Sequence, residues 1–197
     1  MAHCDLNHTL RNQPPGSTLL VWAAEASKLI PQLVSCSSGV MQKITPFLWF
    51  DSQAEEAVQF YLSIFKDAKI HATTRYPEGG PGTAGAVMTI AFELNGEQFV
   101  ALNGGPGYPF TQAVSLVVNC ETQEEIDYFW AKLAADGGEH IQCGWLKDKF
   151  GFHWQIVPTR IWELLHDKDP AVVKRVTSAV WQMEKLDLAA LERAAAD

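Results

Sequence analysis

The residues best suited to chemistry lie in the segment 143–158, which reads CGWLKDKFGFHWQIVP. After Gly151 the residues alternate in polarity, which predicts a strand with one apolar face and one face that carries polar side chains. The apolar face holds Phe152, Trp154 and Ile156, and the other face holds His153, Gln155 and Val157. An imidazole and an amide on one open face are typical of the floor of a small-molecule pocket. His153 could act as a ligand or base there, although such a histidine is more often a satisfied polar residue.

Two further residues are candidates for ligand contacts. Asn103 ends a predicted strand in the segment ALNGGP, where it could hydrogen-bond a ligand or cap the turn that follows. Trp49 could stack on an aromatic or quinone-like ligand, although core packing is the usual role of tryptophan in strands. Both alternatives stay open for each residue.

Other reactive or glycine-rich features have simpler interpretations. Cys143 has no histidine beside it and is expected to pack as a small apolar residue. Asp148, with a lysine on either side, is predicted to lie in a solvated turn. The glycine-rich runs 79–85 and 104–107 do not precede helices that could hold a phosphate, so they are predicted to be loops.

The composition excludes several classes of protein. A chain of 197 residues with 47% hydrophobic content can bury the core of one domain. The net charge is −8 and the 15 Lys and Arg residues are scattered, which argues against a nucleic-acid partner. The four cysteines show no metal-ligand spacing, so we expect reduced thiols and a cytoplasmic location.

The first forty residues differ in character from the rest. Their apolar run 19–24 is much shorter than the roughly 20 residues that span a bilayer, so no membrane partner is expected. A clean strand pattern begins after Met41. We therefore interpret 1–40 as a poorly ordered leader or upstream extension and 41–187 as a single domain.

A unit of one strand and one helix occurs twice. Strand patterns at 44–50 and 113–119 are each followed by a capping box, Ser52 with Glu55 and Thr122 with Glu125. Each box opens a helix with an apolar stripe, and each member of the second stripe follows its counterpart by 69 residues. The stripes are Ala57, Phe60, Tyr61, Ile64 and Phe65, and Ile126, Phe129, Trp130, Leu133 and Ala134.

Further strands complete each unit. Strands are predicted at 69–76, 86–93 and 98–103 in the first half, the last two joined by a hairpin turn at Asn95-Gly96, and at 139–143 and 152–158 in the second half. The order in each half is βαβββ, with module one at 44–103 and module two at 113–158. We therefore predict an α+β fold in which the paired modules form one curved mixed sheet with a concave cleft.

The chain after Pro158 is predicted to be helical. Helices fall within 160–187, and a terminal helix covers 188–197. Trp162 and Trp181 are expected to anchor these helices. They cover the sheet or meet a second subunit, and we expect a homodimer.

Five segments in this order resemble a known family: ITPFLWF, AEEAVQFYLSIF, ALNGGP, CGWLKDKFG and WQIVP. They are similar to the PhnB-like branch of the vicinal oxygen chelate (VOC) superfamily, which includes glyoxalase I and bleomycin-resistance proteins. Members of the branch often carry the name 3-demethylubiquinone-9 3-methyltransferase. The resemblance covers roughly 41–187. It implies paired βαβββ modules, usually dimeric, and a divalent metal in the cleft of the catalytic relatives.

The chain departs from those relatives at the implied metal positions. The resemblance places them near Thr45 or Pro46, Leu102 or Asn103, Ala113, and Gln155, and none of these is a carboxylate or an imidazole. Neutral amide oxygens bind transition metals weakly. No tightly bound metal and no other cofactor is therefore expected.

Three functions remain in competition. The first is a binding protein for a small apolar or aromatic metabolite, held by Trp49, Asn103, His153 and Gln155. The second is an enzyme, either a glyoxalase-like or dioxygenase-like lyase or oxidoreductase, which would use histidines such as His71, His140 or His153, or a methyltransferase in keeping with the name. Methyl transfer is disfavoured because no glycine-rich turn joins a strand to a helix. The third is a structural or oligomerising module.

Overall fold

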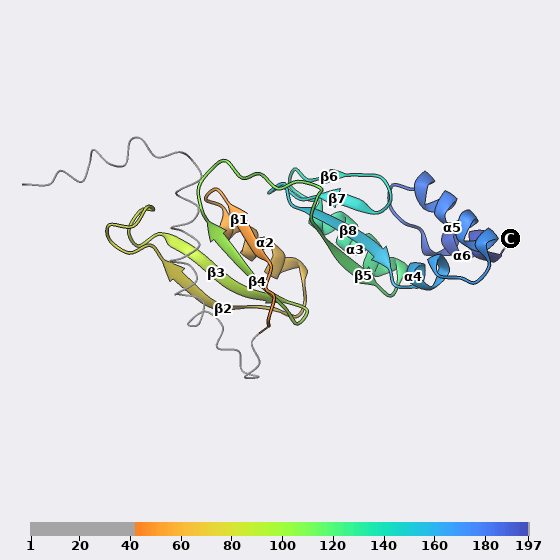
Figure 1. Ribbon diagram of the computed structural model, residues 1–197, viewed down its shortest axis with the longest axis horizontal. Coiled ribbons are helices and arrows are strands. Elements are labelled where there is room, and N and C mark those ends of the chain that lie inside the picture. Colours follow the sequence, from red (N-terminus) through yellow and green to blue (C-terminus); the bar gives the residue numbers. More distant parts are fainter. Residues whose placement is uncertain (1–41, 197) are drawn as a thin grey trace, which may run out of the picture.

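The structure is a computed structural model, and it describes residues 42–196. The predicted leader 1–40, with Cys4 and Cys36, lies outside the described residues. Two modules lie side by side along the long axis of the molecule, and a group of helices lies at the far end of the second module (Figure 1). None of the helices within 42–196 is long and apolar enough to cross a membrane.

Both modules have the same connectivity. Module one contains β1 (Phe47–Phe50), α2 (Ala54–Ile64), β2 (Ala68–Arg75), β3 (Val87–Leu94) and β4 (Glu97–Asn103). Module two contains β5 (Ser115–Cys120), α3 (Gln123–Leu133), β6 (Glu139–His140), β7 (Trp145–Lys147) and β8 (His153–Pro158). The sheet orders are β1-β4-β3-β2 and β5-β8-β7-β6, and the first strand of each module pairs parallel with the fourth. This confirms the α+β fold built from two βαβββ modules.

The strands form two four-stranded sheets rather than one continuous sheet. The modules are instead joined by side chains. Tyr61 of α2 and Phe65, the residue after this helix, contact Trp154 of β8, with ring centroids 5.4 and 5.8 Å apart, and Phe65 also contacts Phe129 of α3. The largest hydrophobic cluster of the described residues therefore spans both modules.

The turn and the second helix cap form as their sequences predict. Asn95 and Gly96 both have positive φ, at 48° and 87°, as a tight hairpin turn requires. Thr122 caps α3 because its side chain accepts a 3.3 Å hydrogen bond from the backbone N–H of Glu125. The turn and the cap each depend on residues that are close together in the sequence, so the sequence pattern predicts both.

The first helix cap and part of module two differ from the prediction. Ser52 does not cap α2; Gln53 precedes the helix without a side-chain cap, and Asn103 Oδ1 accepts a 2.8 Å hydrogen bond from the N–H of Ala54. The sequence also gave no sign of β7 as a separate strand. This strand contains Lys147, so the predicted turn begins only at Asp148.

The C-terminal helices are α4 (Arg160–Leu165), α5 (Pro170–Gln182) and α6 (Leu188–Ala196). They form a second hydrophobic cluster around Val176, Leu186 and Leu191, which also buries Val157 of β8. Trp162 and Trp181 are 45% and 66% exposed, so the prediction that they anchor these helices was wrong. Their ring systems are too exposed to carry the packing.

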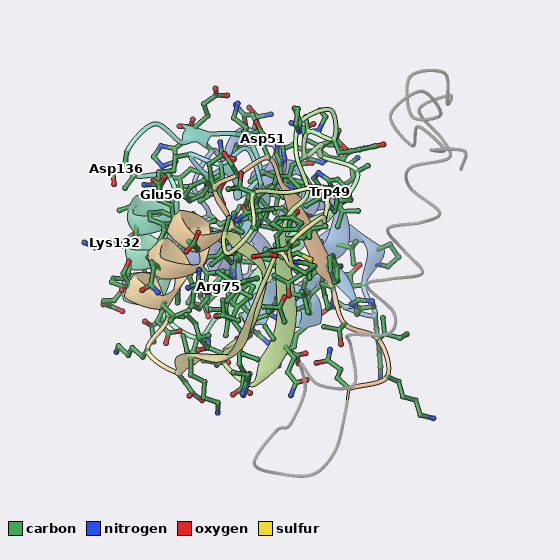
Figure 2. The ribbon with its side chains drawn as sticks, turned by 90° about the vertical axis from the view of Figure 1, so that its left-hand side faces the viewer. Trp49, Asp51, Glu56, Arg75, Lys132 and Asp136 are labelled. Carbon is green, nitrogen blue, oxygen red and sulfur yellow. The ribbon has the colours of Figure 1, made fainter. Side chains whose placement is uncertain are left out.

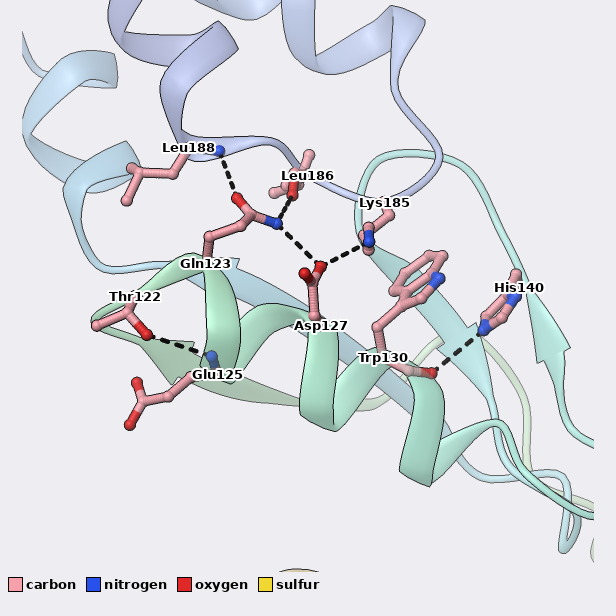
Figure 3. Close-up of polar contacts among 9 residues, drawn as sticks. All are labelled: Thr122, Gln123, Glu125, Asp127, Trp130, His140, Lys185, Leu186 and Leu188. Atoms are coloured by element: carbon pink, nitrogen blue, oxygen red, sulfur yellow. Dashed lines mark hydrogen bonds and ion pairs between the residues drawn. The ribbon is translucent and has the colours of Figure 1, made fainter.

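Polar contacts attach this group to the first turns of α3 (Figure 3). Gln123 Nε2 donates to the carbonyl of Leu186, and Gln123 Oε1 accepts from the N–H of Leu188. Lys185 forms an ion pair with Asp127. The Gln123 side chain of α3 thus bonds the backbone at Leu186, in the short connection before α6, and at Leu188, the first residue of α6.

Candidate functional site

A pocket of about 300 Å³ lies where the two modules meet. It is enclosed by the end of β1, the start of α2, the connection from β4 to β5 and the turn before β8. Its lining residues are Trp49, Phe50, Asp51, Gln53, Gly105, Pro106, Gly107, Tyr108, Pro109, Phe110, Phe150 and Gly151. The volume is at the lower end of the range for small-molecule sites.

Trp49 forms one wall of this pocket. Its Nε1 donates a 2.8 Å hydrogen bond to the carbonyl of Gly105, and Tyr108 meets its ring edge to face at 4.9 Å. Gly104 permits the close approach, because a Cβ at this position would lie 2.3 Å from the indole ring. The glycine-rich connection therefore holds the ring in place, as a tryptophan in a binding wall requires.

The opposite wall belongs to module two and depends on Asp148. This side chain is 1% exposed, so the prediction of a solvated turn was wrong. Its Oδ1 accepts from the N–H groups of Phe150 and Phe152 at 2.9 and 3.0 Å. Its Oδ2 accepts from Tyr61 Oη and Trp154 Nε1 at 2.8 and 2.9 Å.

Burial raises the pKa of Asp148, and the hydrogen bonds from Trp154, Tyr61 and the backbone oppose that rise. The same carboxylate and burial raise the pKa of Tyr61 well above its ordinary value, with burial the larger cause. A buried carboxylate with four donors fixes the turn that carries Phe150 and Gly151. It therefore sets the position of the second wall.

Phe150 also rests on module one. Its ring contacts Phe50, Phe60 and Tyr61 in edge-to-face geometry, at 5.7 to 6.2 Å. The neighbouring Lys149 pairs with Glu56 at 2.8 Å and lies 5.1 Å from the ring centroids of Phe60 and Phe150. Side chains of both modules therefore hold this wall.

Asn103 lies elsewhere. It is in register with Phe50 on the side of the sheet that faces α2. Its Oδ1 caps α2 through Ala54, and its Nδ2 donates to the carbonyl of Val87 at 3.1 Å. Both the oxygen and the nitrogen of this amide therefore form hydrogen bonds within the protein. Asn103 is not among the residues that line the pocket.

His153 and Gln155 lie together on β8, away from the pocket lining. His153 is 6% exposed, its Nδ1 has no hydrogen-bond partner among residues 42–196, and its pKa is lowered first by burial and then by Lys147. Gln155 Nε2 donates to Ser115 Oγ at 2.8 Å. Of the four residues predicted to bind ligand, only Trp49 lines the pocket.

Known proteins with similar sequence or structure identify the family. A family model described as 3-demethylubiquinone-9 3-methyltransferase matches residues 42–157, which is more than half of the chain. The chain belongs to this family. The PhnB protein of Bacillus cereus, which carries the same methyltransferase name, is 42% identical with a TM-score of 0.55, over 60% of this chain and 100% of that one.

Two other solved structures are similar. A Staphylococcus aureus protein is 31% identical with a TM-score of 0.28, over 59% of this chain and 96% of that one. A glyoxalase/bleomycin resistance protein/dioxygenase domain from Frankia is 15% identical with a TM-score of 0.42, over 60% and 93% of the two chains. Among curated proteins, none matches the chain. The family model and the Bacillus cereus structure thus confirm the PhnB-like family for this chain.

The histidines that a PhnB-like enzyme could use do not converge. His71 contacts Glu93 of β3 at 3.0 Å, His140 stacks on Trp130 at 4.5 Å, and His153 lies on β8. Within residues 42–196, no group of three or more His, Cys, Asp or Glu side chains is placed to hold a metal ion. The residues present at the implied metal positions are those already named from the sequence, and they do not fit a transition metal.

Sequence reasoning missed most of the pocket. Tyr108 and Phe110 follow the glycine-rich run and flank Pro109, and this aromatic pattern was the available signal. Phe150 lies beside polar residues in a predicted turn and Asp51 follows a predicted strand, so both gave weaker signals. The aromatic character of the pocket follows from the fold, which gathers these four segments.

Proposed function

We propose that this PhnB-like protein binds a small apolar or aromatic metabolite in the pocket between its modules. The observation that carries the proposal is the lining, to which three separate segments contribute five aromatic residues around one hollow of about 300 Å³. Apolar walls with a few polar groups are the usual composition of small-molecule sites. Trp49 keeps its predicted role, whereas Asn103, His153 and Gln155 support the walls or lie apart from them.

A ligand screen with a matched variant tests this proposal. Thermal-shift screening against metabolites, followed by calorimetry, is expected to find a ligand whose affinity falls at least tenfold in Trp49→Ala, because the ring wall is lost. Trp181→Ala is the control, since Trp181 is exposed on α5 and outside the pocket. A ligand that binds Trp49→Ala and the wild type equally would place the site elsewhere.

We also propose that binding proceeds without a tightly bound metal. Support comes from the neutral residues at the positions where catalytic relatives hold their ion. Protein purified without chelators is expected to contain far less than one divalent metal per chain by mass-spectrometric elemental analysis. A stoichiometric metal that survives dialysis would overturn this part and favour the enzyme.

Methyl transfer receives little support from the fold. Both glycine-rich runs lie between strands, one between β2 and β3 and the other between β4 and β5. A helix N-terminus after such a run is what binds the anionic part of a dinucleotide-like cofactor in parallel sheets. Calorimetry with S-adenosylmethionine is therefore expected to show no binding at micromolar concentrations.

We further propose a cytoplasmic homodimer. The cellular location is proposed because Cys120 and Cys143 are free thiols. The dimer is proposed because β5 is an outer strand with exposed apolar neighbours: Val117 is 39% exposed, and Trp162 lies over the strand with its Nε1 bonded to Asn119. Exposed strand edges with apolar side chains readily pair with another chain.

A pair of matched substitutions tests the dimer. Val117→Lys is expected to convert dimer to monomer in light-scattering chromatography, because a lysine on an edge strand opposes pairing. Ile70→Lys is the control, since Ile70 is 38% exposed on β2, the outer strand of the other module. A wild-type chain that runs as a monomer at micromolar concentration, or dimers that resist both substitutions, would reject this interface.

A further inference from the structure

We propose that the ligand of the inter-module pocket is an organic cation, such as an ammonium group attached to an apolar or aromatic body. This inference rests on the proposed function and names the chemical class of its ligand. It follows from two features of the pocket, which are its aromatic rings and the sign of its charge.

The first feature is a cage of aromatic rings. Trp49 and Phe50 come from β1, Tyr108 and Phe110 from the connection, and Phe150 from the turn. Trp49 meets Tyr108 at 64°, and Phe50 meets Phe110 at 73° and Phe150 at 90°. Ring faces carry the negative part of the quadrupole. A lining rich in aromatic side chains therefore favours a positive charge over a negative one.

The second feature is the charge of the lining. Asp51 is the only charged side chain among the described residues that line the pocket. Its carboxylate has no hydrogen-bond or ion-pair partner within residues 42–196. Asp51 and Trp49 come from the same end of module one, and both lie in the upper half of the view (Figure 2). A carboxylate without a cation, beside aromatic rings, is the complement of an ammonium group.

Lys149 shows that this ring cluster already attracts a cation. Its Nζ lies 5.1 Å from the centroids of Phe60 and Phe150 and pairs with Glu56. The arrangement of an ammonium over rings with one carboxylate is therefore present next to the pocket. Lys149 itself is not among the lining residues, and its ion-pair partner is Glu56 rather than Asp51.

The same lining disfavours an anion. No lysine or arginine occurs among the described lining residues, and a carboxylate faces the hollow from the edge. A phosphate, sulfonate or carboxylate ligand would meet like charge without a cationic side chain in the lining to compensate it. A neutral aromatic ligand remains as the alternative that the experiment must separate.

Three probes of similar shape test the inference on the full chain. Benzyltrimethylammonium, its uncharged isostere neopentylbenzene and the anion benzenesulfonate are titrated while tryptophan fluorescence is measured. We expect the cation to bind about tenfold more tightly than the neutral isostere, as the attraction between a cation and desolvated rings implies. We expect the anion to bind more weakly than either.

Two variants locate the charge effect. Asp51→Asn is expected to lower affinity for the cation about threefold to tenfold and to leave the neutral probe unchanged. Asp136→Asn is the matched control, because Asp136 lies after α3, outside the pocket, with a φ of 59° that asparagine tolerates well. Raising the salt concentration is expected to weaken the binding of the cation probe and of neither other probe.

Each outcome decides one of the two proposals. Equal affinity of the cation and the neutral isostere, or no effect of Asp51→Asn, would overturn the cation inference and leave the proposed function intact. Failure of every probe and of the wider metabolite screen would overturn the proposed function itself. Tighter binding of the anion would overturn the cation inference and show that a basic group outside the lining controls the site.

Discussion

The phenol of Tyr61 in module one donates a 2.8 Å hydrogen bond to the carboxylate of Asp148 in module two. Both side chains are fully buried, and Asp148 also holds the turn that forms one wall of the pocket. The pair therefore connects the assembly of the two modules to the shape of the candidate site. Changes to it are expected to affect stability and binding together.

Replacing Asp148 by asparagine should destabilise the protein strongly. The Trp154 ring N–H and the two backbone N–H groups can only donate, so either orientation of the new amide sets an N–H₂ group against donors. We expect a loss of about 3 kcal/mol in the free energy of unfolding measured in urea, against about 1 kcal/mol for Tyr61→Phe. Asp136→Asn should stay within about 0.5 kcal/mol. A loss below that of Tyr61→Phe would contradict the role given to the carboxylate.

The pH dependence of stability should carry the signature of Asp148. Burial raises its pKa in the folded protein, so the folded state binds this proton more tightly than the unfolded state. Its contribution is fully present below the unfolded pKa and is lost as pH rises through the folded pKa. The unfolding free energy of the wild type minus that of Asp148→Asn should therefore increase as pH falls from 7 toward 4.

Other carboxylates act in the opposite direction. Bonds from Lys69 and His71 lower the pKa of Glu93, and bonds from Lys185 and Gln123 lower that of Asp127. Their contributions are present above the unfolded pKa and are lost as pH falls through the folded pKa. Both the wild type and Asp148→Asn retain these groups, so their contributions cancel when the two unfolding free energies are subtracted. A difference that shrinks on acidification would mean that the four donors outweigh burial.

Two neighbouring glycines separate steric from backbone effects in the pocket. Gly104→Ala places a Cβ 2.3 Å from the Trp49 ring without requiring a positive φ, so the ring must move. We expect a cost of about 1 to 3 kcal/mol, together with a change in near-ultraviolet circular dichroism and loss of ligand binding. Gly105→Ala meets open space at a φ of 85° and should cost about 1 kcal/mol with the Trp49 signal retained. Equal spectra for the two variants would argue against the packing of Trp49 on Gly104.

Asn103 should behave as a structural residue. Asn103→Ala removes the cap of α2 and the bond to Val87, and we expect a loss of about 1 to 2 kcal/mol in thermal or urea unfolding. The affinity for a pocket ligand should change less than twofold once the protein is folded. Asn119→Ala, which removes one exposed hydrogen bond from Trp162 Nε1, provides the comparison and should cost less than Asn103→Ala. A large loss of affinity with unchanged stability would restore Asn103 to the binding site.

The sequence predicted the features that depend on neighbours in the chain. The two helical stripes, the Thr122 cap and the Asn95-Gly96 turn are each encoded within a few residues, and the repeat spacing of 69 residues linked the halves. The resemblance of five ordered segments then identified the family. These features together were enough to predict the class of fold.

The features that the sequence did not reveal depend on distant partners. Asn103 caps α2 from 49 residues away, which no local capping pattern encodes. Asp148 looked solvated because lysines flank it. In the core, however, Tyr61, which is 87 residues away in the sequence, donates a hydrogen bond to its carboxylate. The β7 strand has only three residues, and the pocket combines four segments. Contacts of this kind become visible only when the modules are packed.

Gln123 belongs to the family domain and yet bonds the chain on both sides of Asp187, beyond the end of the family match at 157. Val157 is likewise buried by residues that follow it. A gene fragment trimmed to the family limits would therefore remove both backbone partners of the Gln123 amide and expose the apolar end of β8. For expression and crystallisation, the shortest sensible unit runs through the last helix.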